Sequence, residues 1–397
     1  MMGINSTRKQ KVHSLTGRIT LPLLLDSFKS VKRNRGAAGI DKVSIKMFEA
    51  NLSDNLHALL RDLKNGSFEP FPLRRAFVPK NETELRPLGI PAVRDRVAQE
   101  AVRRLLNPIF EPLFHDSSHG FRQGRNCHGA IRQALALHQR GLRVVLDADI
   151  RAFFDNLPQP VIMQALAAEV ADGNILRLIQ KFLRSGVMEN GVFKPTTIGT
   201  PQGGVISPLL ANIVLNQFDW QLHARGFHFV RYADDFVVIC HSNTQAEGAL
   251  HFVRQVLATL GLHLSAEKTR ITTFGKGYSF LGFVLSSRSR RMRPKSLQKF
   301  KDKVRKLTVR HHNFEAELII EKLNRVLQGT SHFFATSFST CRWLFQKLDS
   351  WIRRRLRCMK FKRKRATDNY KLRNRTFHKL GLFSMEQFCI LQRAAKA

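Results

Sequence analysis

Short apolar runs alternate with helical patterns through residues 1–285, and this alternation constrains the fold more than any other feature of the chain. The runs at 143–146 and 227–230 are short and rich in Val, Phe and Leu, which predicts buried strands. Segments 97–106 and 247–260 repeat apolar residues at helical spacing. Strands and helices that alternate in this way predict a mixed α/β (α+β) core.

Positive charge is concentrated in the last third of the chain. The whole sequence has 66 Lys and Arg against 30 Asp and Glu, a net charge of +36, and residues 286–397 alone contain 30 and 7 of these, or +23. Aromatic residues are interleaved with the cationic runs at 288–306 and 353–365, as in helices that bury one face and present cations to phosphates. A solvated helix face or a localisation signal would explain either run alone. Both together favour a nucleic-acid partner.

The five cysteines show no CxxC spacing, which argues against a disulfide scaffold and a structural zinc site and fits a reducing compartment. The apolar run at 19–25 is interrupted by Pro22 and matches neither a signal peptide nor a membrane span. We therefore expect a soluble, cytoplasmic, nucleic-acid-associated protein with no membrane partner.

Three aspartates lie where predicted strands end or turn. Asp149 ends the strand that begins near residue 143, and Asp234 and Asp235 form the tip of a predicted hairpin. An Asp in a turn usually bonds its own backbone, so each group alone is most simply structural. In so basic a chain, however, adjacent carboxylates between apolar strands need a counter-charge, and Mg²⁺ prefers such oxygen ligands. Two such ions about 3.5–4 Å apart catalyse phosphoryl transfer.

Three motifs in this order resemble those of reverse transcriptases. Tyr232-Ala233-Asp234-Asp235 resembles their YADD signature, and Asp149-Ile150 with Phe153-Phe154-Asp155 resembles their first catalytic motif. Segment 199–212, which begins Gly199-Thr200-Pro201-Gln202-Gly203, resembles the loop and helix between these motifs in the form found in group II intron-encoded enzymes. The chain is identified as a member of the group II intron-encoded reverse transcriptase/maturase family, with the resemblance strongest over residues 30–285.

The resemblance implies a right-hand polymerase. Fingers and palm would occupy residues 1–285, including an N-terminal extension of about residues 1–72. A helical, basic thumb or maturase-like domain would occupy 286–397, after the polar break at 286–290. No Cys-rich endonuclease segment follows, so we expect no cleavage of a second target strand.

The resemblance also implies roles for individual residues. Metal ions would be held by Asp149, Asp234, Asp235 and the backbone of Ile150, and Lys268 would protonate the departing pyrophosphate. The nucleotide would contact Lys80 and Arg86 at its triphosphate, Ile150, Phe154 beneath the sugar, and Gln202. Primer and template would contact Tyr232, Ala233, Gly203, Phe280, Leu281 and Gly282.

The implied function is RNA-directed DNA polymerisation with two Mg²⁺ ions, for which Mn²⁺ is a substitute. Its partners would be dNTPs, an RNA template paired with an RNA or DNA primer, and the chain's own group II intron RNA in a bacterial cytoplasm. Two alternatives stay open. One is a free-standing reverse transcriptase used in repair or phage defence, and the other is a splicing maturase whose polymerase site is idle. Segment 326–334 lacks the Trp and Tyr of the Gly-Trp-x-x-Tyr-Phe pattern common in intron maturases.

Overall fold

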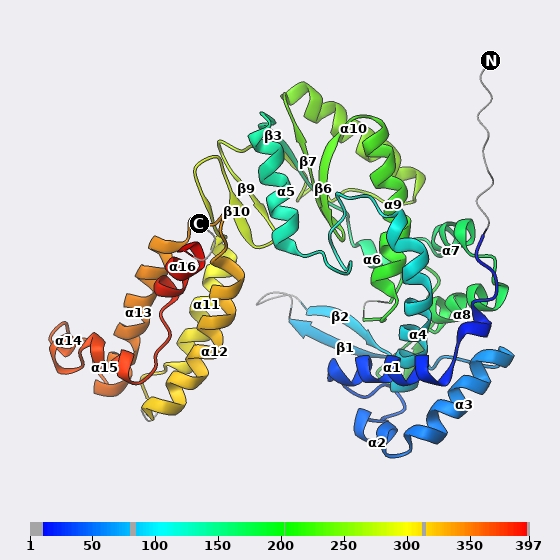
Figure 1. Ribbon diagram of the computed structural model, residues 1–397, viewed down its shortest axis with the longest axis horizontal. Coiled ribbons are helices and arrows are strands. Elements are labelled where there is room, and N and C mark those ends of the chain that lie inside the picture. The colour runs from blue at the N-terminus through cyan, green and yellow to red at the C-terminus, as the bar shows by residue number, and fades with distance from the viewer. Residues whose placement is uncertain (1–10, 80–84, 202, 312–314, 395–397) are drawn as a thin grey trace. The chain divides into compact units, whose positions relative to one another are not determined.

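The chain forms two compact units, Met1–Ile271 and Thr272–Ala397 (Figure 1). The computed structural model describes residues 11–79, 85–201, 203–311 and 315–394. The sequence pattern puts the boundary later, at residue 285. In the structure, the polar residues that follow form the turn between β10 (Phe283–Leu285) and β11 (Arg290–Met292), which pair in one sheet. A hairpin turn interrupts an apolar pattern in the same way as a domain boundary.

A four-stranded sheet forms the centre of the first unit, in the order β6-β7-β3-β8. Its strands are β3 (Val144–Asp149), β6 (His228–Tyr232), β7 (Asp235–Cys240) and β8 (Arg270–Thr273). β7 pairs antiparallel with both β6 and β3. The strand and hairpin predictions are therefore confirmed, and the mixed α/β class with them.

Three helices pack on this sheet: α5 (Cys127–Gln139), α9 (Ser207–Ala224) and α10 (Asn243–Thr259) (Figure 1). Two of them begin at side-chain caps. Asn126 accepts a hydrogen bond from the Gly129 amide and Ser242 accepts one from the Gln245 amide; each such cap stabilises a helix by about 1 kcal/mol. The predicted helix at 247–260 is α10, and that at 97–106 lies within α4 (Val93–Phe110), which packs against α9.

A second sheet of the first unit, in the order β2-β1-β4-β5, presents a hairpin. Its strands are β1 (Leu73–Pro79), β2 (Leu85–Ile90), β4 (Val187–Glu189) and β5 (Val192–Lys194). The remaining helices of this unit are α1 (Leu21–Arg33), α2 (Ile45–Ala50), α3 (Leu52–Asn65), α6 (Phe153–Asn156), α7 (Gln159–Glu169) and α8 (Gly173–Arg184). β1 and β2 form this hairpin, and Arg86, which the resemblance assigns to a triphosphate, lies on β2.

The second unit combines a small sheet with helices. Strand β9 (Tyr278–Phe280) joins β10 and β11 in the order β11-β10-β9. The helices are α11 (Pro294–Leu307), α12 (Ala316–Phe334), α13 (Arg342–Phe361), α14 (Asp368–Lys371), α15 (Asn374–Lys379) and α16 (Met385–Ala394). The cationic runs lie largely on α11 and α13, whose apolar faces bury residues such as Phe300 and Ile352. None of the helices in the described part of the chain is long and apolar enough to cross a membrane.

The carboxyl of Asp95 is a buried acid that makes stability depend on pH. It lies in the first turn of α4, accepts a hydrogen bond from the Phe71 amide at 2.9 Å, and is 1% exposed. Burial raises the pKa of Asp95 from 3.8 to about 7, against the opposing effect of Arg94. An unfolded chain ionises this group near pH 4 but the folded chain only near pH 7, so the free energy of unfolding falls as pH rises between these values.

Asp95→Asn keeps a hydrogen-bond acceptor and removes the ionisation. We expect its free energy of unfolding, relative to the wild type, to increase between pH 4 and pH 7.5 by on the order of 3 kcal/mol. Urea denaturation at both pH values measures this, with Asp54→Asn, an exposed acid in the first turn of α3, as the control. An equal pH dependence for wild type and Asp95→Asn would contradict the assignment.

Candidate active site

Three aspartates lie at one end of the paired strands β3 and β7 in the central sheet. β3 and β7 pair so that Asp149 lies opposite Asp235. The pairing of Tyr232 with Asp235 leaves Ala233 and Asp234 as the turn between β6 and β7. Residues directly opposite in an antiparallel pair have Cα atoms about 4.5–5.5 Å apart. Asp149, Asp234 and Asp235 are thus brought together from segments far apart in the sequence.

The electrostatics of Asp234 confirm that charged groups surround it. Burial is the main cause that raises the pKa of this carboxyl above its usual value, and the negative charge of Asp149 raises it further. A backbone hydrogen bond and the positive charges of Arg86 and Lys268 act in the opposite direction. A cation bound beside Asp149 and Asp234 would oppose both burial and repulsion and would lower the pKa of Asp234.

Lys268 supplies a counter-charge beside Asp149. Its Nζ donates a hydrogen bond to Oδ2 of Asp149 at 2.7 Å, and the side chain is 59% exposed. The backbone holds this turn in place: the Ser265 amide donates to the Asp149 carbonyl at 2.8 Å, and Ile150 forms a bridge with Leu264. The ammonium therefore lies against a carboxylate oxygen that a metal ion could also use.

The donor set fits a hard divalent cation. Carboxylate oxygens from Asp149, Asp234 and Asp235 are the ligands that Mg²⁺ and Mn²⁺ accept, with substrate phosphates and water completing the shell. Across the described ranges, no group of three or more His, Cys, Asp or Glu side chains forms a ready metal cluster. In the structure, the ammonium of Lys268 bonds to Oδ2 of Asp149.

Phe154 lies beside the loop that contains Gly203, and this loop packs against the hairpin of β1 and β2. It belongs to the short helix α6, and its carbonyl accepts a hydrogen bond from the Thr200 amide at 2.8 Å. Gly203 has φ +114°, and a Cβ there would lie 2.4 Å from the Gly89 carbonyl oxygen of β2. Only glycine permits this approach. The half-buried Phe154 ring lines a cavity of about 160 Å³ together with Pro87, Gly89 and Thr200.

The other predicted residues are placed as follows. Arg86 is exposed on β2, opposite Val78. Tyr232 is half-buried, and burial raises its pKa. Lys80 and Gln202 lie outside the described residues.

Three of the predicted primer-contact residues, Phe280, Leu281 and Gly282, belong to the second unit. Phe280 pairs with Phe283, so Leu281 and Gly282 form a tight turn, with φ +47° and +89°. Positive φ at both positions is typical of a type I′ hairpin turn. The Gly282 carbonyl accepts a hydrogen bond from the Arg293 amide at 3.0 Å, which ties this turn to the start of α11.

Two side chains support the site although the sequence analysis did not select them. Arg270 on β8 pairs with Asp147, two residues before Asp149, at 3.1 Å between Nη2 and Oδ2. Gln99 of α4 accepts a hydrogen bond from the Val205 amide at 2.8 Å and so holds the loop that contains Gly203. Alternation along a strand puts Asp147 and Asp149 on one face, and this spacing could have indicated that Asp147 lies near the site. Nothing local pointed to Arg270 or Gln99.

A carboxylate-bearing β-hairpin that pairs with a strand ending in a third aspartate is typical of the palm of template-dependent nucleic-acid polymerases. Residues 78–285 match the family described as reverse transcriptase (RNA-dependent DNA polymerase). Residues 297–379 match the group II intron, maturase-specific domain. The chain belongs to the reverse transcriptase family and is of the group II intron-encoded type, which confirms the family, fold and enzyme class predicted from the motifs.

Individual relatives agree with this assignment. Protein YkfC of Escherichia coli is 35% identical over 323 residues, which cover 70% of this chain and 85% of YkfC. The group II intron-encoded protein LtrA of Lactococcus lactis is 41% identical over 167 residues, 42% of this chain and 28% of LtrA. A 91 kDa protein in the cob intron of Schizosaccharomyces pombe is 30% identical over 59% of this chain and 36% of its own length. The chain thus spans most of YkfC but only about a third of the two intron proteins.

Removal of the Lys268 ammonium should strengthen metal binding in the absence of nucleotide, because this group occupies Oδ2 of Asp149. An exposed ion pair contributes less than about 1 kcal/mol, so we expect Lys268→Met to lower the dissociation constant for Mn²⁺ by about 2- to 5-fold. Electron paramagnetic resonance of free Mn²⁺ measures this dissociation constant. Lys32→Met, which breaks an exposed pair with Glu49, is the control and should change nothing. Weaker Mn²⁺ binding by Lys268→Met would contradict the arrangement.

Proposed function

We propose that the first unit synthesises DNA on an RNA template at Asp149, Asp234 and Asp235. The observation that carries this proposal is the register of β3 and β7, which sets Asp149 opposite Asp235 with Asp234 in the adjoining turn. These acids, with the carbonyl of Ile150, would hold two Mg²⁺ ions or Mn²⁺ in their place. When bound, such ions lower the pKa of an attacking hydroxyl and stabilise charge on the leaving oxygen.

The protein's own groups would bind and orient the substrates. Arg86, with Lys80 nearby in sequence, would meet the triphosphate oxygens that the metals leave free. Lys268, already within 2.7 Å of Asp149, would give a proton to the departing pyrophosphate. A primer 3′-hydroxyl would attack the α-phosphate of a dNTP. Tyr232 and Ala233, which precede the two acids, would support the primer end.

The pocket beside Phe154 would select the sugar. The ring would lie where a ribonucleotide carries its 2′-hydroxyl, and steric exclusion of a hydroxyl is a workable basis for discrimination. Gly203 lets the loop pack tightly on β2. By the resemblance, Gln202 would contact the nucleotide and the template.

The second unit would bind RNA. Its match to the maturase-specific domain and the cations on α11 and α13 support this role. Phe280, Leu281 and Gly282 would support the primer strand, whose duplex with RNA is gripped through backbone and shape. Its ligands would be the template-primer duplex and a host group II intron RNA. The protein would act in a bacterial cytoplasm. The functional division would follow the two family matches, with fingers and palm before residue 285 and the thumb after it.

Primer extension on an RNA template with Mg²⁺ tests the catalytic proposal. The variant Asp234→Ala/Asp235→Ala should lose activity by on the order of 10³-fold or more, because it lacks two oxygen donors at the charge that develops in the transition state. Asp26→Ala, an exposed acid on α1, is the control and should extend normally. Equal extension by wild type and double variant would contradict catalysis at these acids. Extension by neither would also contradict it and would favour a maturase whose polymerase site is idle.

Phe154→Val should raise the incorporation of ribonucleotides relative to deoxyribonucleotides by about 10- to 100-fold, since a smaller side chain leaves room for a hydroxyl. Single-nucleotide insertion kinetics measure the ratio of kcat/KM. Phe153→Val alters the adjacent buried ring, 5.2 Å away between centroids. It should reduce stability and leave the ratio unchanged. If Phe154→Val and the wild type gave the same ratio, the proposal that Phe154 selects the sugar would be wrong.

A further inference from the structure

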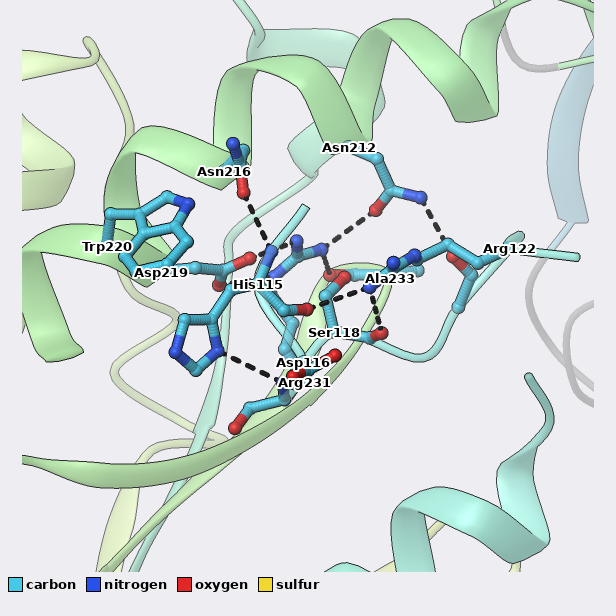
Figure 2. Close-up of polar contacts among 12 residues, drawn as sticks. His115, Asp116, Ser118, Arg122, Asn212, Asn216, Asp219, Trp220, Arg231 and Ala233 are labelled. Carbon is cyan, nitrogen blue, oxygen red and sulfur yellow. Dashed lines mark hydrogen bonds and ion pairs between the residues drawn. The ribbon is translucent and has the colours of Figure 1, made fainter. Parts of the chain in front are cut away.

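A fully buried arginine lies directly before the catalytic turn. Arg231 is on β6, 0% exposed, two residues from Ala233 and three from Asp234. Figure 2 shows its guanidinium between Asp219 and Asn212, both from α9. Nε and Nη2 donate to the two carboxylate oxygens of Asp219 at 2.7 and 2.5 Å. Asp219 is itself 0% exposed, so the pair is sealed from water.

The remaining nitrogen of the guanidinium is directed at the turn. Nη1 of Arg231 donates to the carbonyl oxygen of Ala233 at 3.0 Å and to Oδ1 of Asn212 at 2.9 Å. Ala233 has φ +59°, a left-handed conformation that is unfavourable for any residue with a Cβ. The carbonyl that Arg231 holds belongs to the peptide bond that leads into Asp234. The arginine therefore fixes the strained residue of the turn from one side.

A second segment fixes the same residue from the other side. Asn212 donates through Nδ2 to the Gly120 carbonyl at 2.8 Å. A Cβ on Gly120 would lie 2.4 Å from the Ala233 nitrogen, so the two backbones are in direct contact. The strand-like segment before Gly120 also pairs with β6: the His119 amide donates to the Arg231 carbonyl at 2.9 Å, and the Arg231 amide donates to the Ser117 carbonyl at 2.8 Å.

We propose that Arg231, Asp219 and Asn212 are positioning residues that set the direction of the Asp234 and Asp235 carboxylates, and hence the affinity of this site for divalent cations. The inference rests on the proposed function of these two acids. A buried ion pair is weak evidence for stability, because apolar residues of similar volume commonly replace one at no cost to the fold. The fork of an arginine holds a carboxylate with two nitrogens and leaves a third donor for the turn, which no apolar side chain or lysine can reproduce.

The spacing on α9 supports this role. Asn212 and Asp219 are seven residues apart, two turns of helix, so both face β6. Asn216, between them on the same face, accepts from the His115 amide at 3.1 Å and so holds the start of the segment that leads to Gly120 (Figure 2). One helix face thus positions both backbones that enclose Ala233.

The test uses the full-length protein and the double variant Arg231→Met/Asp219→Leu, which removes both charges together. We expect this variant to fold with a lowered melting temperature, because the Ala233 carbonyl and Oδ1 of Asn212 lose their buried donor. We expect kcat for primer extension to fall about 100-fold and KM for dNTP to change little. The dissociation constant for Mn²⁺, measured by electron paramagnetic resonance without any turnover, should rise about 10-fold. Glu100→Gln, which alters a buried carboxylate bonded to Arg103 and Arg104, is the control and should leave the affinity for Mn²⁺ unchanged.

Asn212→Leu is a second test that keeps the Arg231–Asp219 pair intact, and it decides the matter if the double variant does not fold. It should lower kcat and weaken Mn²⁺ binding in the same direction, by a smaller factor. A folded double variant, or a folded Asn212→Leu protein, with wild-type kcat and Mn²⁺ affinity would overturn the inference. If the wild-type protein extended no primer, the proposed polymerase function would be wrong. The Mn²⁺ affinities of the variants would still test whether Arg231, Asp219 and Asn212 position the acids.

Discussion

The antiparallel register of β3 and β7 is the constraint on which the rest of the site depends. It sets Asp149 opposite Asp235, and these residues are far apart in the sequence. Side chains alternate between the two faces of a sheet, so a slip of one residue would place another residue opposite Asp149 and would exchange the two faces of one strand. Both faces of β3 and β7 are buried, so the exchanged side chains would have to pack against neighbours of the wrong shape. The burial of Val145, Leu146, Val237 and Val238 therefore fixes the positions of the acids. Hydrophobic packing determines the geometry of a site made of carboxylates.

Charge is used in three distinct ways in this protein. Most cations of α11 and several of α13, such as Arg354 and Lys360, lie on exposed helix faces, where they suit a phosphate backbone. Arg357 of α13 is instead buried. Arg86 and Lys268 are close enough to the acids to lower the pKa of Asp234. Arg231 is neutralised by Asp219 and acts through the direction of its hydrogen bonds. The same residue type therefore serves attraction at the surface and orientation in the interior.

Several elements of the fold could be predicted from local pattern. The hairpin around Asp234, the strand that ends at Asp149, and the helices α4 and α10 all follow from the spacing of apolar residues. The polar break at 286–290 predicts a domain boundary, but in the structure it forms the turn between β10 and β11. A polar turn inside a sheet and a boundary between units have the same composition, and only the pairing of β10 with β11 distinguishes them.

The sequence by itself determined the chemistry of this protein: three aspartates at strand ends, a glycine-rich loop, a basic second unit, and motifs specific enough to name the family. The tertiary structure alone decided which groups support that chemistry. In the sequence, Arg231 is one of many cations in a very basic chain. The structure shows that it bonds to Asp219, Asn212 and the carbonyl of Ala233. The resemblance assigns Lys268 a role as proton donor, but only the tertiary structure shows its hydrogen bond to Asp149. The physical reason is that local pattern records periodicity and burial, whereas a hydrogen bond between distant residues depends on how the whole core packs.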